Sequence, residues 1–182
     1  MKMNLPNKLT IFRVILVPVL VALLLIDQDN QMQRYIAVAV FIIASLTDLL
    51  DGKIARKYNL VTNFGKFMDP LADKLLVSSA MICLIETGDI KALPVVIIVG
   101  RDFIINGFRL IASNNGKVIA ADMWGKVKTT IQMIMVIVLI ARVNNPIVTE
   151  IGQALVIAAV VMTIFSLVDC LIKNKDVLKD EN

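Results

Sequence analysis

Four aspartates form two close pairs in the first half of the chain. Asp48 and Asp51 are three residues apart, and Asp69 and Asp73 are four apart. On helices, either spacing places both carboxylates of a pair on one face. The polar stretch between the pairs, residues 57–64, can reverse the chain. The pattern therefore predicts two antiparallel helices that aim four carboxylates at one place.

Converging carboxylates must protonate, pair with bases or hold cations. Bases are close in sequence, so the aspartates could instead cap helix ends and pair with Lys53, Arg56, Lys57 and Lys66. Each unpaired carboxylate at mid-membrane depth costs about 2.5–3.5 kcal/mol, which favours bound cations for a set of four. Oxygen ligands in a chain without histidine select hard ions such as Mg²⁺ or Mn²⁺. Four carboxylates suit two such ions, and two ions can clamp a diphosphate.

The elements that position these residues are strongly apolar. The 182 residues are 58% hydrophobic, and their mean hydropathy is +0.79. The excess lies in six runs, at residues 11–26, 35–47, 75–85, 93–100, 127–141 and 151–168. A soluble all-α protein with six such helices would have too little polar surface. The sequence therefore predicts an all-α, polytopic membrane bundle of six transmembrane helices with an N-terminal interfacial segment, built as one domain over residues 1–182.

The basic residues predict the orientation. With the N-terminus inside, 14 of the 19 lysines and arginines fall on inner segments and two lie within the fourth span. Only Arg34, Lys91 and Arg142 fall within or directly beside the outer turns, at residues 27–33, 86–91 and 143–150. This bias predicts a protein of the cell membrane with both termini and the active site on the cytoplasmic side. No basic patch is interleaved with aromatic residues, which argues against a nucleic-acid partner.

The acidic segment also carries a specific motif. Residues 48–73 read D-x2-D-G-x2-A-R-x8-G-x3-D-x3-D. This pattern resembles the signature of the CDP-alcohol phosphatidyltransferase family at all eight fixed positions. The opening residues 4–10 and the six-span layout agree with that family too, so the resemblance covers essentially the whole chain.

The resemblance implies a reaction and a site. A phosphatidyl group would pass from CDP-diacylglycerol to an alcohol, with release of CMP, in a protein that contacts membrane lipids and forms a homodimer. The four aspartates would bind two divalent cations, Mg²⁺ or Mn²⁺, and Asp73 would act as the general base. The CDP site would be lined by Gly52, Ala55, Arg56 and Gly65. The absence of histidine excludes a transfer through a histidine nucleophile.

The acceptor should be recognised outside this motif. Asp102, Asn106 and Arg109 form a polar stripe in the fourth span, although Asp102 and Arg109 could simply pair with each other. Lys126 and Lys128 begin the fifth helix, where each alone could be an ordinary positive-inside anchor. Together with Arg109 they predict a basic pocket for an acceptor that carries a phosphate.

The fourth and fifth helices and Ser166 resemble the branch of the family that uses glycerol 3-phosphate. Their shared arrangement is G-R-D, a later Arg, and G-K-x-K-T-T. Inositol phosphate, serine and phosphatidylglycerol are the alternative acceptors within the family. A small membrane transporter is the alternative from another class. The carboxylates gather at one end of two helices, however, and no inverted repeat is visible, which argues against a transporter.

Overall fold

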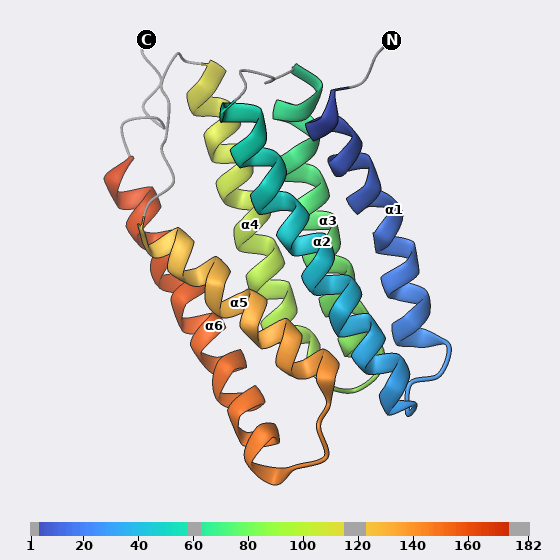
Figure 1. The fold of residues 1–182 in the computed structure, drawn as a ribbon. Coiled ribbons are helices and arrows are strands. Elements are labelled where there is room, and N and C mark those ends of the chain that lie inside the picture. The colour runs from blue at the N-terminus through green and yellow to red at the C-terminus, as the bar shows by residue number, and fades with distance from the viewer. Residues whose placement is uncertain (1–3, 58–62, 115–122, 175–182) are drawn as a thin grey trace. The chain divides into compact units, whose positions relative to one another are not determined.

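The computed structural model describes residues 4–57, 63–114 and 123–174, and in this part of the chain helices are joined by short turns, with no strand (Figure 1). The six helices are α1 (Leu5–Leu25), α2 (Gln31–Lys57), α3 (Asn63–Glu86), α4 (Ala92–Asn114), α5 (Met123–Ala141) and α6 (Pro146–Lys173). Each predicted apolar run lies within one of them, except that the first run extends one residue beyond the end of α1. The all-α prediction is confirmed.

Local chemistry sets where two helices begin. The side-chain oxygen of Asn30 accepts a hydrogen bond of 3.1 Å from the backbone N–H of Met32. At α6, the Asn145 side chain accepts one of 2.9 Å from the backbone N–H of Ile147. Both side chains satisfy N–H groups that a helix start leaves unpaired. As a result, α2 and α6 begin inside the polar stretches 27–33 and 143–150, earlier than their apolar runs suggested.

The turn after α3 depends on a glycine. Gly88 has a φ of 75°, a conformation that glycine adopts without the steric cost that a side chain adds. The chain then folds back, and the N–H of Asp89 donates to the carbonyl of Leu84 at 2.9 Å. This closes α3 at the outer turn predicted for residues 86–91, and it points Asp89 toward neighbouring helices.

The first of two compact units comprises Met1–Ile90 and Val136–Val143. In it α1 packs against both α2 and α3, and α2 also touches α3. Its core combines large apolar side chains such as Leu20 and Phe41 with small ones such as Ala37 and Ala80, all fully buried. Figure 1 shows α2 and α3 running in opposite directions, so the end of α2 and the start of α3 lie at the same end of this unit.

The second unit comprises Lys91–Met135 and Asn144–Asn182. Here α4 packs along α6. Phe108 and Ala112 of α4 are buried, with Leu171 of α6 packed against them. The prediction of one domain over residues 1–182 stays a prediction.

Among the residues that the structure describes, three helices are long and apolar enough to cross a membrane, namely α1 over Asn7–Leu25, α5 and α6. On α6 the large side chains of Ile157, Val161, Ile164 and Val168 are exposed along one helix face, while the hydroxyl-bearing Thr163 and Ser166 are buried. Apolar groups outside and polar groups inside are typical of a surface that meets lipid. The fold thus indicates a membrane protein, and the count of six spans stays a prediction.

Candidate active site

The two aspartate pairs occupy matching levels of two packed helices. Asp51 lies six positions before the end of α2, and Asp69 lies six positions after the start of α3. Asp48 and Asp73 lie nine and ten positions from the same helix ends. At a rise of about 1.5 Å per residue, Asp51 and Asp69 lie about 9 Å from these helix ends, and Asp48 and Asp73 lie about 14 Å from them. The backbone therefore places the four positions at matching levels of α2 and α3. That their carboxylates converge on one place stays a prediction.

Asp73 is the member of this set whose side chain the structure describes, and it is partly buried. The side chains of Asp48, Asp51 and Asp69 lie outside the described residues. So do those of the four residues implied for the CDP site, which are Gly52, Ala55, Arg56 and Gly65. Their backbones belong to α2, except that of Gly65, which belongs to α3.

The four positions fit divalent cations by their chemistry. They offer carboxylate oxygens only, from two helices that meet side by side. Such donors suit Mg²⁺ or Mn²⁺, which keep coordination positions open for substrate phosphates. The chain has no histidine, and its two cysteines are buried elsewhere. This set of donors therefore favours a hard cation over a metal that prefers nitrogen or sulfur ligands.

A third polar element faces the same helices and was not predicted. Asn7, Thr10 and Arg13 follow one another at three-residue spacing on α1, and their exposed fractions are 9%, 0% and 0%. Figure 1 shows that α1 begins at the end of the unit where α2 stops. Arg13 is eight positions from the start of α1, about 12 Å along the helix. A buried cation thus lies at the level of the acidic positions.

The high mean hydropathy of α1 gives no sign of these three polar residues. In the sequence, Arg13 contributes only to the distribution of basic residues that predicts the orientation. The signal that could have found it is the periodicity of the polar residues themselves, since spacing of three to four residues puts them on one helix face. A fully buried arginine requires compensating partners, because the desolvation of its charge is costly.

In the second unit, Asp102 joins two cations. Its two carboxylate oxygens accept from the Lys128 ammonium at 2.7 and 2.8 Å. The Arg101 guanidinium donates to Asp102 at 3.1 Å and, through its other terminal nitrogen, to the Ser166 hydroxyl at 3.0 Å. Within the described residues, the ion-pair partners of Asp102 are thus Lys128 and Arg101, and not Arg109. The network links α4, α5 and α6.

The three cations predicted for the acceptor differ in their surroundings. Lys128 has a side-chain exposure of 1%, so it is no surface anchor. Lys126 is exposed, and Arg109 is partly buried. The Nε atoms of Arg109 and Arg101 are both buried without a hydrogen-bond partner in the part of the chain that the structure describes. A buried donor left in this way costs about 1–3 kcal/mol, which a bound anion would recover.

An aromatic contact holds the start of α5 beside α6. The ring centroids of Trp124 and Phe165 are 4.9 Å apart, with the planes at 85°. This edge-to-face arrangement is the favoured one for aromatic pairs and is worth about 0.5–1.5 kcal/mol beyond its buried area. Phe165 is the neighbour in sequence of Ser166, so the contact also steadies the Arg101 network.

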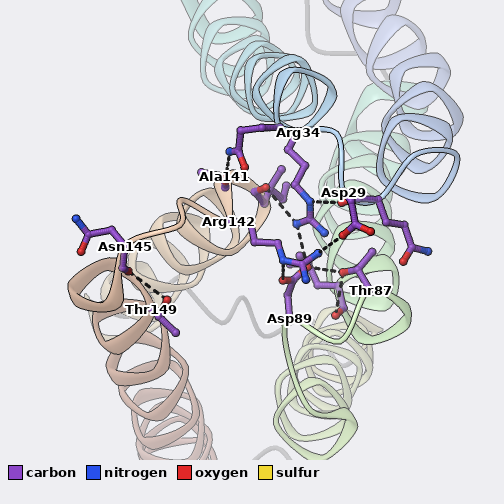
Figure 2. Close-up of polar contacts among 12 residues, drawn as sticks. Asp29, Arg34, Thr87, Asp89, Ala141, Arg142, Asn145 and Thr149 are labelled. Atoms are coloured by element: carbon purple, nitrogen blue, oxygen red, sulfur yellow. Dashed lines mark hydrogen bonds and ion pairs between the residues drawn. The ribbon is translucent and has the colours of Figure 1, made fainter.

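A second charged cluster joins Arg34, near the start of α2, to Asp89 and Arg142 (Figure 2). Arg34 donates to the Asp89 carboxylate at 2.9 Å, to the Gln28 carbonyl at 2.7 Å and to the Ile140 carbonyl at 3.4 Å. Arg142 approaches the other Asp89 oxygen at 3.3 Å. The cluster joins the turn before α2, the turn after α3 and the end of α5, which is a structural role.

The chain matches known proteins over most of its length. The model of a family described as CDP-alcohol phosphatidyltransferase matches residues 3–165. A protein of Bacillus subtilis (strain 168) is 46% identical over 143 residues, which are 73% of this chain and 74% of the relative. One of Haemophilus influenzae is 38% identical over 185 residues, covering 99% of this chain and 98% of the relative. One of Shigella flexneri serotype 5b is 36% identical over 185 residues and covers both chains completely. All three relatives are named CDP-diacylglycerol–glycerol-3-phosphate 3-phosphatidyltransferase.

Proposed function

This chain belongs to the CDP-alcohol phosphatidyltransferase family, and from that membership we propose its reaction. It transfers the phosphatidyl group of CDP-diacylglycerol to glycerol 3-phosphate and yields phosphatidylglycerophosphate and CMP. The observation that carries this proposal is the shared name of relatives that are 36–46% identical over 73–100% of the chain. The matching levels of the four aspartate positions on α2 and α3 support the same chemistry.

The donor half of the site is proposed on α2 and α3. Asp48, Asp51, Asp69 and Asp73 would hold two divalent cations, Mg²⁺ or Mn²⁺. When bound, the ions neutralise the diphosphate of the donor and polarise the phosphorus next to the lipid. Arg56 forms charge-assisted hydrogen bonds to a phosphate. Gly52, Ala55 and Gly65 let the nucleotide approach the helix backbones, because they have small side chains or none.

Asp73 is proposed as the general base. The acceptor hydroxyl loses its proton to this carboxylate as its oxygen attacks the phosphorus of the donor. A new oxygen–phosphorus bond forms, the bond between that phosphorus and the CMP phosphate breaks, and CMP leaves. Positioning and charge stabilisation supply most of the rate in such transfers, so no covalent enzyme intermediate is needed.

The acceptor's phosphate is proposed to bind Arg109, Lys126 and Lys128. Support comes from the buried Nε of Arg109, which has no partner in the described part of the chain, and from the burial of Lys128. Cations removed from water bind phosphate more strongly than surface cations do, because the low dielectric strengthens each contact. Inositol phosphate, serine and phosphatidylglycerol remain the competing acceptors, and a transporter remains the competing class.

The arrangement in the membrane belongs to the same proposal. The chain crosses the cell membrane six times, with both termini and the active site on the cytoplasmic side, where water-soluble glycerol 3-phosphate is available. The distribution of basic residues supports this orientation. Resemblance to the family supports a homodimer.

An acceptor panel tests the proposal. Purified protein in detergent receives CDP-diacylglycerol labelled in the lipid, a divalent cation and one acceptor at a time. We expect lipid product and CMP in equal amounts with glycerol 3-phosphate, and little of either with serine, inositol phosphate or phosphatidylglycerol. Faster transfer to another acceptor would overturn the substrate assignment. Absence of CMP release with every acceptor would favour the transporter.

A further inference from the structure

The network around Asp102 contains more positive than negative charge. One carboxylate is shared by the Lys128 ammonium and the Arg101 guanidinium, so these three groups together carry a net charge of +1. The side chains are largely withdrawn from water, with exposed fractions of 1% for Lys128, 12% for Arg101 and 20% for Asp102. Charged groups in such surroundings must be held by partners that compensate their lost hydration.

The geometry fixes both cations to the same carboxylate. Lys128 is held through both oxygens, at 2.7 and 2.8 Å. Arg101 is held on one side by Asp102 and on the other by Ser166. Two of its three guanidinium nitrogens are therefore committed to α4 and α6. The third, Nε, is buried and has no partner among the residues that the structure describes.

We propose that Asp102 is a positioning residue for the phosphate of the acceptor, and that Arg101 contacts this phosphate. This inference rests on the proposed function. Asp102 would itself repel a phosphate. Its contribution is to hold Lys128 and Arg101 in one arrangement before the acceptor binds, so that the acceptor does not have to order two long side chains. Ser166 supports Arg101 from α6.

Positioning and simple attraction predict opposite results for one substitution. Asp102→Asn raises the net charge of the network from +1 to +2. If only charge mattered, binding of glycerol 3-phosphate would become tighter. If Asp102 positions the two cations, the loss of their shared partner weakens binding, although the attraction has grown. We expect the KM for glycerol 3-phosphate to rise about tenfold, with the KM for CDP-diacylglycerol changed less than twofold.

The pair Asp169–Lys173, whose lysine is exposed, provides the matched control. Its nitrogen–oxygen distance is 2.8 Å, and its side chains are 21% and 53% exposed. Asp169→Asn makes the same change in charge in the same unit, without breaking the Asp102 network. We expect both KM values to stay within twofold of wild type. Asp102→Glu should recover most of the lost affinity, since it restores the shared acceptor. Ser166→Ala should raise the KM for glycerol 3-phosphate about threefold.

A second readout needs no turnover. Glycerol 3-phosphate alone should raise the unfolding temperature of the wild type and of Asp169→Asn in detergent, and should have much less effect on Asp102→Asn. If Asp102→Asn does not fold, Asp102→Glu and Ser166→Ala decide the question by the same measurements.

The outcomes separate this inference from the proposed function. If the wild type uses glycerol 3-phosphate while Asp102→Asn leaves its KM unchanged or lower, the positioning role is wrong and the proposed function stands. An equal rise in the KM for glycerol 3-phosphate in Asp169→Asn would also contradict the positioning role of Asp102. If the wild type prefers an acceptor without a phosphate, the proposed function fails and the positioning role fails with it.

Discussion

The Arg34 guanidinium lies 2.9 Å from the Asp89 carboxylate, and the two side chains are only 2% and 10% exposed. They come from the start of α2 and the turn after α3 (Figure 2). Removing one member of a buried ion pair leaves the other charge without compensation and costs about 3–5 kcal/mol. We therefore expect Asp89→Asn to lower the unfolding temperature in detergent strongly. The neighbouring pair of Arg142 and Asp29 is exposed and 3.5 Å apart, so Asp29→Asn should change stability by less than about 1 kcal/mol.

The metal prediction concerns the carboxylates on α2 and α3. Asp48→Asn, Asp51→Asn and Asp69→Asn should each nearly abolish CMP release, because each removes a charged ligand from a site for two ions. A chelator should inhibit the wild type in the same way, and added Mg²⁺ or Mn²⁺ should restore activity. Activity that resists the chelator would contradict the mechanism.

The base prediction separates Asp73 from the other three aspartates. Asp73→Asn removes the proton acceptor but leaves an oxygen that can still contact a cation. Turnover should fall by about 10²-fold or more, while binding of CDP-diacylglycerol, followed by equilibrium binding in the presence of the cation, should be partly retained. A variant that turns over at the wild-type rate would exclude Asp73 as the base.

The acceptor prediction concerns Arg109 and Lys126. Charge-assisted hydrogen bonds are each worth about 1.5–3 kcal/mol, so Arg109→Gln or Lys126→Gln should raise the KM for glycerol 3-phosphate about tenfold or more. The KM for CDP-diacylglycerol should change little. Lys173→Gln, which removes an exposed cation, is the control and should leave both constants unchanged. Wild-type kinetics in both site variants would mean that the phosphate binds elsewhere.

The topology prediction is tested by single cysteines in a chain with Cys83 and Cys170 replaced. Lys91 and Asn144 are exposed residues of the predicted outer turns, and cysteines there should react with an impermeant thiol reagent added outside intact cells. A cysteine at residue 59, in the predicted inner connection, should react only after the cells are opened. Position 88 is a poor choice because its φ of 75° favours glycine. External labelling at residue 59 would reverse the orientation.

Periodicity was sufficient where the signal is local. Asp48, Asp51, Asp69 and Asp73 could be placed on two helices that meet, because spacings of three and four define a helix face and the polar stretch between them breaks the helix. The boundaries of α2 and α6 were missed by a few residues, because Asn30 and Asn145 start these helices within stretches that composition alone assigns to turns.

By itself, the sequence determined the helical class, the apolar segments and the two aspartate pairs, since each depends on residues within a few turns of one another. The tertiary structure decided what the cations do. Lys128 is 26 residues from Asp102, and Arg34 is 55 residues from Asp89, so neither pair exists until separate helices pack. From the sequence alone, a lysine or arginine at the end of an apolar run is compatible with a membrane-boundary position and with a buried site. Only packing distinguishes the two, because burial removes the water that would otherwise solvate the charge and makes a partner obligatory.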